Sequence, residues 1–218
     1  MEESGRTGWI GWSFIAGCAL AIPSGWLLAY LAALPFLLGL FFFLLLGLIA
    51  GATMFRFGAQ AAAPSRGAAW LMGTTVALVM LLTTLTAEYR AFPRSVERVV
   101  RKSFYESLTP ARRTELTRGV EKFAASHLAE NHPPGGFVGY LRWAATSGRV
   151  TAPRILKTST VEYRLPQRGT LWLIRVALSL ALVEWTIMSQ VLGLCAAAKS
   201  AAHQPATEGP NASSDDVS

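Results

Sequence analysis

The stretch TGWIGWSFIAGCALAIPSGWLLAYLAALPFLLGLFFFLLLGLIAGATMF, residues 7–55, contains no Asp, Glu, Lys or Arg. It is 49 residues long, whereas about 20 apolar residues are enough for a helix to cross the hydrocarbon layer of a bilayer. The stretch is therefore too long for one membrane span and has the right length for two. The turn between them is expected at residues 32–34, because Pro35 suits the first helical position of the next span.

Two further apolar segments bring the number of predicted spans to four. The spans are expected at about residues 9–31, 35–55, 68–87 and 170–195. The second holds seven Leu, five Phe and one Ile, which together favour insertion by about 6 kcal/mol. The whole chain is 52% hydrophobic and 15% charged, against about 25% charged in typical soluble domains. We therefore predict an all-α, multi-pass integral membrane protein of the cell membrane.

Charged and polar residues divide the chain into four predicted regions. These are a three-span membrane region (1–87), a basic, mostly helical loop domain that faces water (88–169), the fourth transmembrane helix (170–198) and a disordered tail (199–218). The loop holds 15 of the 20 Lys and Arg residues and seven of the 13 acids, a net charge of +8. The tail is rich in Ala, Ser and Asp and contains two prolines, so it cannot bury a core.

The loop begins with an apolar stripe in a basic surrounding. The stripe residues recur at helical spacings: Val96, Val99, Val100, Phe104 and Leu108. Four basic residues flank the stripe and are candidate contacts for anionic lipid headgroups: Arg94, Arg98, Arg101 and Lys102. Such a helix either lies at the membrane surface or packs its stripe against the rest of the loop, and the sequence leaves both readings open.

The remainder of the loop is predicted to form two more short helices. The first opens at Pro110 with Thr109 as its cap, and the second covers about residues 137–146. The segment up to Gly169 is expected to be extended or irregular, with room for one or two short strands. A core of three short helices is marginal by itself, so we expect it to lean on the membrane, on the spans or on a partner chain.

Positive charges give conflicting indications of membrane orientation. Four spans place both termini on one side, which carries Arg6, Arg56, Arg66 and Lys199. The first 20 and the last 21 residues of the loop together carry ten positive residues, so ten against four favour a cytoplasmic loop. The first hairpin alone points the other way through Arg56 and Arg66. We predict the cytoplasmic side for the loop.

Glu184 is the sharpest functional candidate, because an intramembrane carboxylate is costly and normally faces a cavity or a partner. Arg175 lies nine residues earlier, on the opposite face of the same helix, so the two cannot pair within one straight helix. Glu184 would need Arg175 of another chain, a Thr or Ser of another span, water or a proton. It either relays ions or protons or is a structural, hydrogen-bonded residue.

Two small motifs lie within the first two spans. Gly47 and Gly51 form a small-xxx-small pair that lets helix backbones approach closely, and packing within the bundle is favoured over dimerisation. Residues 15–18 match a bacterial lipobox, with Cys18 as the acceptor of lipid. However, the apolar run continues beyond Cys18, which favours an uncleaved span.

Motifs for catalysis, nucleotides and metals are not recognisable in the sequence. His127 and His132 are five residues apart, which does not place both on one helix face. We therefore expect no enzymatic activity, no cofactor, no metal and no nucleic acid partner. The expected function is anchoring, assembly or interaction, with the bilayer, anionic headgroups, other membrane subunits or further copies of the chain as partners. The alternative is a small oligomeric transporter or channel subunit that uses Glu184.

Overall fold

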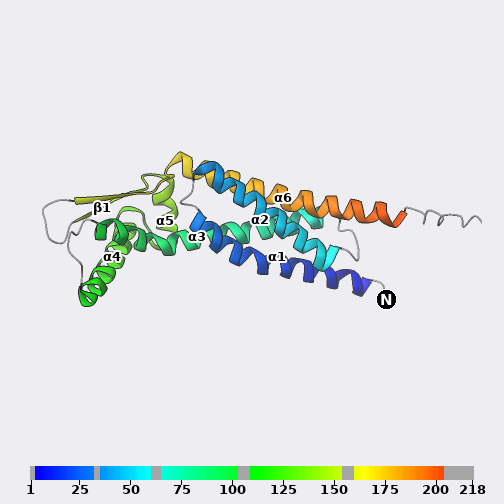
Figure 1. The fold of residues 1–218 in the computed structure, drawn as a ribbon, viewed down its shortest axis with the longest axis horizontal. Coiled ribbons are helices and arrows are strands. Elements are labelled where there is room, and N and C mark those ends of the chain that lie inside the picture. Colours follow the sequence, from blue (N-terminus) through cyan, green and yellow to red (C-terminus); the bar gives the residue numbers. More distant parts are fainter. Residues whose placement is uncertain (1–2, 32–34, 60–64, 103–108, 154–159, 204–218) are drawn as a thin grey trace, which may run out of the picture.

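The computed structural model of the protein describes residues 3–31, 35–59, 65–102, 109–153 and 160–203. Four long helices form an elongated bundle, and a smaller domain extends from one end of it (Figure 1). The long helices are α1 (Glu3–Leu31), α2 (Phe36–Met54), α3 (Arg66–Lys102) and α6 (Thr170–His203). A π-helical segment, Phe55–Ala59, extends α2. Within the described residues, these four helices are long and apolar enough to span a membrane, as predicted.

The bundle is closed by contacts between neighbouring helices. α1 packs mainly against α3, and α2 packs mainly against α6. Further contacts join α1 to α2 and α3 to α6. The N-terminal end of α1 and the C-terminal end of α6 lie at the end of the bundle that is remote from the small domain (Figure 1). The first residues of α1 and the last residues of α6 therefore lie at the same end of the bundle, as four spans require.

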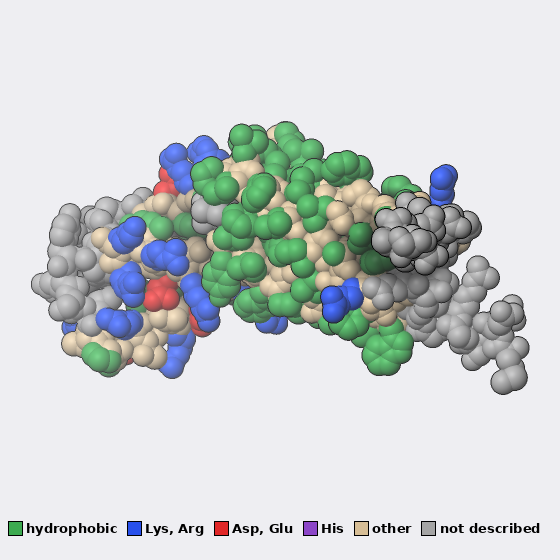
Figure 2. Space-filling model, turned by 45° about the vertical axis from the view of Figure 1, so that its right-hand side comes forward, with side chains coloured by type: hydrophobic (Ala, Val, Ile, Leu, Met, Phe, Trp, Pro, Cys, Tyr) green, Lys and Arg blue, Asp and Glu red, His purple; other side chains and the backbone are tan. Residues whose placement is uncertain are grey.

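The bundle has a mainly apolar interior and an apolar outer surface. Among the described residues, five hydroxyl side chains are buried: Ser13, Ser24, Thr84, Ser179 and Thr186. Large apolar side chains face outward, including Leu37 at 78%, Leu71 at 72% and Trp185 at 64% exposure. Hydrophobic side chains cover the bundle in Figure 2, whereas Lys and Arg gather at the small domain. An apolar surface of this extent is stable only against lipid or another apolar partner.

The small domain combines two helices and a hairpin. The helices are α4 (Pro110–Asn131) and α5 (Gly136–Ala145), and the strands are β1 (Arg149–Pro153) and β2 (Thr160–Arg164). The strands pair antiparallel, with Val150 opposite Tyr163 and Thr151 opposite Glu162. The insert is thus mainly helical with a short hairpin. Pro110 begins α4 after Thr109, although within the described residues the Thr109 side chain makes no capping hydrogen bond.

Three helix boundaries differ from the predicted ones. The third helix does not end at residue 87 but continues without a break to Lys102, so one helix belongs to both the bundle and the small domain. α6 likewise continues to His203, beyond the predicted start of the tail at residue 199. α1 begins at Glu3, before the predicted start at about residue 9, and Pro23 lies inside it without ending it, as predicted. Phe104, Leu108 and residues 204–218 lie outside the described part of the chain.

A single core joins the small domain to the bundle. It takes Phe92, Val96 and Val100 from α3, together with Leu116 and Val120 from α4, among others. Tyr140 and Trp143 of α5, Val150 of β1 and Trp172 of α6 complete it: Trp143 is fully buried and Trp172 is 4% exposed. The core of the small domain is therefore completed by side chains of the long helices. The sequence analysis expected support from the membrane, from the spans or from a partner chain, and the spans provide it here.

Candidate functional site

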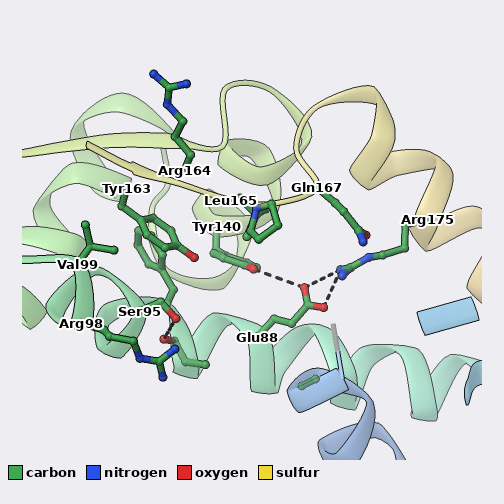
Figure 3. Close-up of a pocket in the computed structure, with 14 residues that line it drawn as sticks. Glu88, Ser95, Arg98, Val99, Tyr140, Tyr163, Arg164, Leu165, Gln167 and Arg175 are labelled. Carbon is green, nitrogen blue, oxygen red and sulfur yellow. Dashed lines mark hydrogen bonds and ion pairs between the residues drawn. The ribbon is translucent and has the colours of Figure 1, made fainter. Parts of the chain in front are cut away.

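A carboxylate of α3 and a guanidinium of α6 form a buried ion pair where the bundle meets the small domain (Figure 3). Arg175 Nη2 lies 2.6 Å from Glu88 Oε1 and 2.9 Å from Glu88 Oε2. The Arg175 and Glu88 side chains are only 12% and 8% exposed. Removing one partner from such a pair leaves an uncompensated buried charge, which typically costs about 3–5 kcal/mol. Each residue therefore fixes the position of the other.

Tyr140 brings the small domain into contact with this ion pair. Its hydroxyl lies 3.5 Å from Glu88 Oε2, a long hydrogen bond in which the phenol is the donor. Burial raises the pKa of Tyr140, and the neighbouring Glu88 carboxylate raises it further. The phenol therefore stays protonated throughout the physiological range and can donate to Glu88. Helices α3, α5 and α6 thus meet at one carboxylate.

A cavity of about 250 Å³ lies beside the ion pair, between α3, α5, β2 and the segment that leads from β2 into α6. Four charged side chains line it: Glu88, Arg98, Arg164 and Arg175. Four uncharged polar side chains also line it: Ser95, Tyr140, Tyr163 and Gln167. In Figure 3 the ends of Tyr140, Glu88 and Arg175 meet, whereas the guanidinium groups of Arg98 and Arg164 point away from them on opposite sides. The cavity wall therefore combines apolar surface with a small number of polar and charged groups.

Three further features of the cavity wall bear on what it can bind. Among the described residues, Gln167 Oε1 is buried without a hydrogen-bond partner. Burial raises the pKa of Tyr163 as well, so its phenol stays protonated at neutral pH. Arg164 is exposed and also contacts Glu162, with Nη2 2.6 Å from Oε2. The cavity thus offers hydrogen-bond donors and one unused acceptor.

Glu184 lies deeper in the bundle and has a different partner. The Thr74 hydroxyl of α3 donates to Glu184 Oε1 at 2.6 Å. Glu184 is 14 residues from the start of α6 at Thr170, about 21 Å along the helix axis. A threonine of another span was one of the four partners considered from the sequence, and Thr74 is such a partner.

Arg175 and Glu184 are not brought together, as the helix geometry predicted. Arg175 instead pairs with Glu88, which the sequence reading left as the first residue of the loop. The order of the charged residues offered a signal for this pair. The third and fourth spans run in opposite directions, so the end of the third lies beside the start of the fourth. The first acid after the third apolar segment is therefore near the first basic residue of the fourth. The pairing needs no second copy of the chain.

The apolar stripe on α3 is covered by the small domain and is not free to enter a membrane surface. Val96 and Val100 are 1% and 3% exposed and pack in the shared core. The sequence left two possibilities open for the stripe. In the structure, the stripe packs against the rest of the loop. The four flanking basic residues are exposed: Arg94, Arg98, Arg101 and Lys102. Their contact with lipid stays a prediction.

Gly47 and Gly51 lie against α6 of the same chain. A Cβ atom at Gly47 would overlap Thr186 Oγ1 and lie 3.2 Å from Val183 Cα. One at Gly51 would lie 2.7 Å from Gln190 Cβ and 3.0 Å from the Ile187 carbonyl oxygen. The two glycines thus permit close packing of α2 on α6 within the bundle.

His127 and His132 come together at the end of α4, with ring centroids 6.1 Å apart. Within the described residues, no group of three or more His, Cys, Asp or Glu side chains is arranged to hold a metal ion. Cys18 lies inside the uninterrupted helix α1.

The fold and the site define a coarse class of protein: a mainly helical chain with four helices able to span a membrane and a basic domain fixed to one end of them. No protein family, curated protein or solved structure matches the chain. A function can therefore be inferred only from the geometry of the molecule itself.

Proposed function

We propose that the protein is a membrane-anchored assembly subunit, in which four transmembrane helices hold a basic helical domain in a fixed position for a partner chain. The observation that carries the proposal is the continuity of α3 from Arg66 to Lys102. From Glu88 onward this helix has 15 residues, which extend about 22 Å along its axis. A domain that was only tethered would not share a 37-residue helix with its anchor.

Three contacts support a fixed rather than a mobile domain. α3 contributes Phe92 and Val96 to the core of the domain, and α6 contributes Trp172. The buried Glu88–Arg175 pair lies at the same junction and is approached by Tyr140. Hinge motion at the junction would expose these groups together, so the structure favours a rigid presentation of the domain.

The charge of the domain supports an acidic partner. The stretch of residues 88–169 carries a net charge of +8. On α3, Arg94 and Arg101 are exposed on the side opposite the buried Val96 and Val100. Electrostatic complementarity between such a face and an acidic one speeds encounter and fixes register. The partner is another subunit or a second copy of the chain that presents acidic residues.

The proposal is tested on the full chain extracted from its native membrane in a mild detergent. We expect a complex that contains a second chain, or further copies, in fixed stoichiometry. The charge-reversal variant Arg94→Glu/Arg101→Glu should dissociate it, whereas Arg56→Glu/Arg66→Glu, with the same charge change at the other end of the bundle, should not. A lone 23.5 kDa chain in the wild type, or equal behaviour of the two variants, would overturn the proposal.

A second candidate function, a small transporter or channel subunit, is favoured by the bond between Thr74 and Glu184. A carboxylate about 21 Å along α6 that faces another helix is the kind of group that binds a cation or a proton inside a membrane. The same hydrogen bond is also what a Glu184 with a purely structural role would need. The two roles differ in what Glu184→Gln does to flux, as set out in the Discussion.

A further inference from the structure

The bond between Thr74 and Glu184 lies at the outer edge of the contact between α3 and α6. Both residues are partly exposed. Their neighbours on the two helix surfaces are exposed as well: Trp70, Leu71 and Leu78 on α3, and Ala181 and Trp185 on α6. In a bilayer, such a surface faces either acyl chains or the span of another protein. The Glu184 carboxylate is therefore within reach of a group that approaches from outside the bundle.

Thr74 differs from the other threonines of α3 in the acceptor of its hydrogen bond. The other four donate to the carbonyl oxygen four residues earlier in their own helix: Thr75, Thr83, Thr84 and Thr86. The Thr74 hydroxyl instead donates to Glu184 Oε1 at 2.6 Å. Because a hydroxyl has only one proton to donate, this bond fixes one carboxylate oxygen and leaves the other, Oε2, without that donor.

The second oxygen of Glu184 needs a donor. In the described part of the chain, Oε2 makes no hydrogen bond and Glu184 belongs to no ion pair. The nearest charged residues of α6 are Arg175, nine positions earlier, and Lys199, 15 positions later. These separations are about 13.5 Å and about 22 Å along the helix axis. A carboxylate this far inside an apolar span is costly and normally pairs with another polar group.

Trp185, the next residue of α6, is a second indication of a partner at this position. Its side chain is 64% exposed. Tryptophan favours the boundary between acyl chains and headgroups, yet Trp185 lies about 15 Å from Arg175 along the helix axis. The face of an indole ring attracts a cation. An exposed indole beside a carboxylate therefore suits a basic side chain better than it suits acyl chains.

A second copy of the chain does not provide that base. Residues 7–55 contain no charged residue, and residues 67–87 and 176–198 contain none besides Glu184. Arg175, which the sequence offered as a partner from another chain, is already paired with Glu88 at 2.6 Å. A base at the depth of Glu184 therefore has to come from the span of a different protein.

We infer that the outer edge of the α3–α6 contact binds a transmembrane helix of another protein that carries a Lys or Arg side chain near its middle. This side chain donates to Glu184 Oε2, while Thr74 holds Oε1 and Trp185 lies beside the cation. The inferred contact rests on the proposed assembly function and deepens it, because it names the chemistry by which the spans recognise a subunit.

The test is association of the full chain with synthetic transmembrane peptides in phosphatidylcholine vesicles. Energy transfer is measured from a dye on Ser200→Cys, in a background without Cys18 and Cys195, to a dye on the peptide. The peptides are leucine-rich helices of about 23 residues with either Lys or Leu at the centre. We expect the Lys peptide to associate at least about fivefold more tightly, the lower end of the effect of one hydrogen bond between spanning helices. Equal association of the two peptides would overturn the inference.

A third peptide controls for charge without position. It carries the same Lys seven residues from the centre, about 10 Å along the helix axis, so that its composition and net charge are unchanged. We expect it to associate like the Leu peptide. If it associates as tightly as the central Lys peptide, charge alone drives association and the inference is wrong.

Two variants of α6 locate the contact. Glu184→Gln keeps an oxygen that can accept from Thr74 but removes the negative charge, and should bring the central Lys peptide to within about twofold of the Leu peptide. Ser189→Ala removes a hydroxyl from an exposed position of the same helix and should keep the full preference. A preference that persists in Glu184→Gln, or that is lost in both variants, would contradict the assignment of the contact to Glu184.

Energy transfer between donor-labelled and acceptor-labelled copies of the chain, without peptide, tests a second copy as the occupant. We expect Glu184→Gln to leave this signal unchanged. Self-association that Glu184→Gln abolishes would place a second copy at the contact and overturn the inference. Failure of the peptide test leaves the assembly proposal intact, because that proposal is tested on the native complex at Arg94 and Arg101. A lone chain in the native membrane would overturn the assembly proposal without changing the peptide result.

Discussion

Arg175 and Glu184 are nine residues apart on α6, yet they bond to positions 14 residues apart on α3, namely Glu88 and Thr74. Along the helix axes these separations are about 13.5 Å and about 21 Å. The difference of about 7.5 Å is close to the length of an arginine side chain. Since side chains lean toward the N-terminus of their helix, Arg175 extends toward the small domain, where its charge lies at the edge of the apolar bundle.

Breaking the Glu88–Arg175 pair from one side should destabilise the junction strongly. Glu88→Gln leaves Arg175 buried without a counter-charge and should lower the free energy of unfolding by about 3–5 kcal/mol. The double variant Glu88→Leu/Arg175→Leu should recover most of this loss, because no charge is then left buried. Thermal unfolding of the protein in nanodiscs measures both changes.

Glu162→Gln is the matched control for the ion pair. Glu162 bonds to Arg164 at the same 2.6 Å, but its side chain is 34% and that of Arg164 56% exposed. Exposed pairs contribute at most about 1 kcal/mol, so this variant should melt close to the wild type. A Glu88→Gln protein that is as stable as Glu162→Gln would contradict the role assigned to the buried pair.

Gly47→Ala should disrupt the packing of α2 on α6. The added methyl group would overlap Thr186 Oγ1, and the backbone of Val183 limits relief. We expect a loss of about 1–3 kcal/mol, typical of an overpacked interior, in a detergent unfolding titration. Gly39→Ala in the same helix is the control, since nothing lies within 4 Å of its added Cβ. Equal effects at the two positions would show that helix propensity, not contact with α6, is measured.

Glu184→Gln separates a transport role from a structural one. The amide oxygen of Gln can still accept the hydrogen bond from Thr74, so folding and expression should be retained. If the protein carries ions or protons, the variant should lose cation or proton flux in reconstituted vesicles while the wild type conducts. Flux that is unchanged by the substitution would dismiss Glu184 as the site, and a wild type without flux would dismiss transport.

The end of α4 should loosen in mild acid. Burial lowers the pKa of His127, and the nearby charge of His132 lowers it further, against a smaller opposing effect of Glu130. Burial also lowers the pKa of His132. The folded state therefore binds these protons less readily than the unfolded state. Its stabilisation is complete above the ordinary pKa of about 6.5 and is lost as the pH falls below it.

Hydrogen exchange of α4 at pH 7.5 and pH 5.5, corrected for intrinsic exchange rates, measures this effect. We expect weaker protection at pH 5.5 in the wild type. In His127→Gln/His132→Gln the difference between the two pH values should shrink. A wild type that is equally protected at both pH values would contradict the prediction.

Membrane orientation can be measured by cysteine labelling in a background without Cys18 and Cys195. With a cytoplasmic domain, a cysteine at the exposed position Arg113 should react with an impermeant maleimide only after the cells are opened. A cysteine at the exposed position Ser200, at the other end of the bundle, should react in intact cells. The reverse pattern would place the domain outside.

The long helices could be predicted from the sequence because each depends on a local property, a run of apolar residues of sufficient length. The two-span reading of residues 7–55 is matched by α1 and by α2 with its π-helical extension. Gly47 and Gly51 could be recognised from their spacing alone. The end of the third helix could not be predicted in this way. A charged residue such as Glu88 marks the end of the apolar composition but not the end of the helix.

The candidate site was less accessible from sequence because it depends on contacts between distant residues. Glu88 and Arg175 are separated by 87 positions, and Tyr140 comes from a third helix. The apolar stripe on α3 was recognised, but periodicity cannot say whether lipid or protein covers it. Only the packing of α4 and α5 on Val96 and Val100 decides between the two.

Because α3 is continuous, a change in the tilt of its apolar part moves the small domain with it. Its outer 15 residues form an arm of about 22 Å, so a change of about 10° in the tilt of the helix would move the tip by about 4 Å. The tilt of spanning helices follows the thickness of the surrounding bilayer. If the bundle spans a bilayer, the position of the basic domain would therefore shift with the thickness of that bilayer.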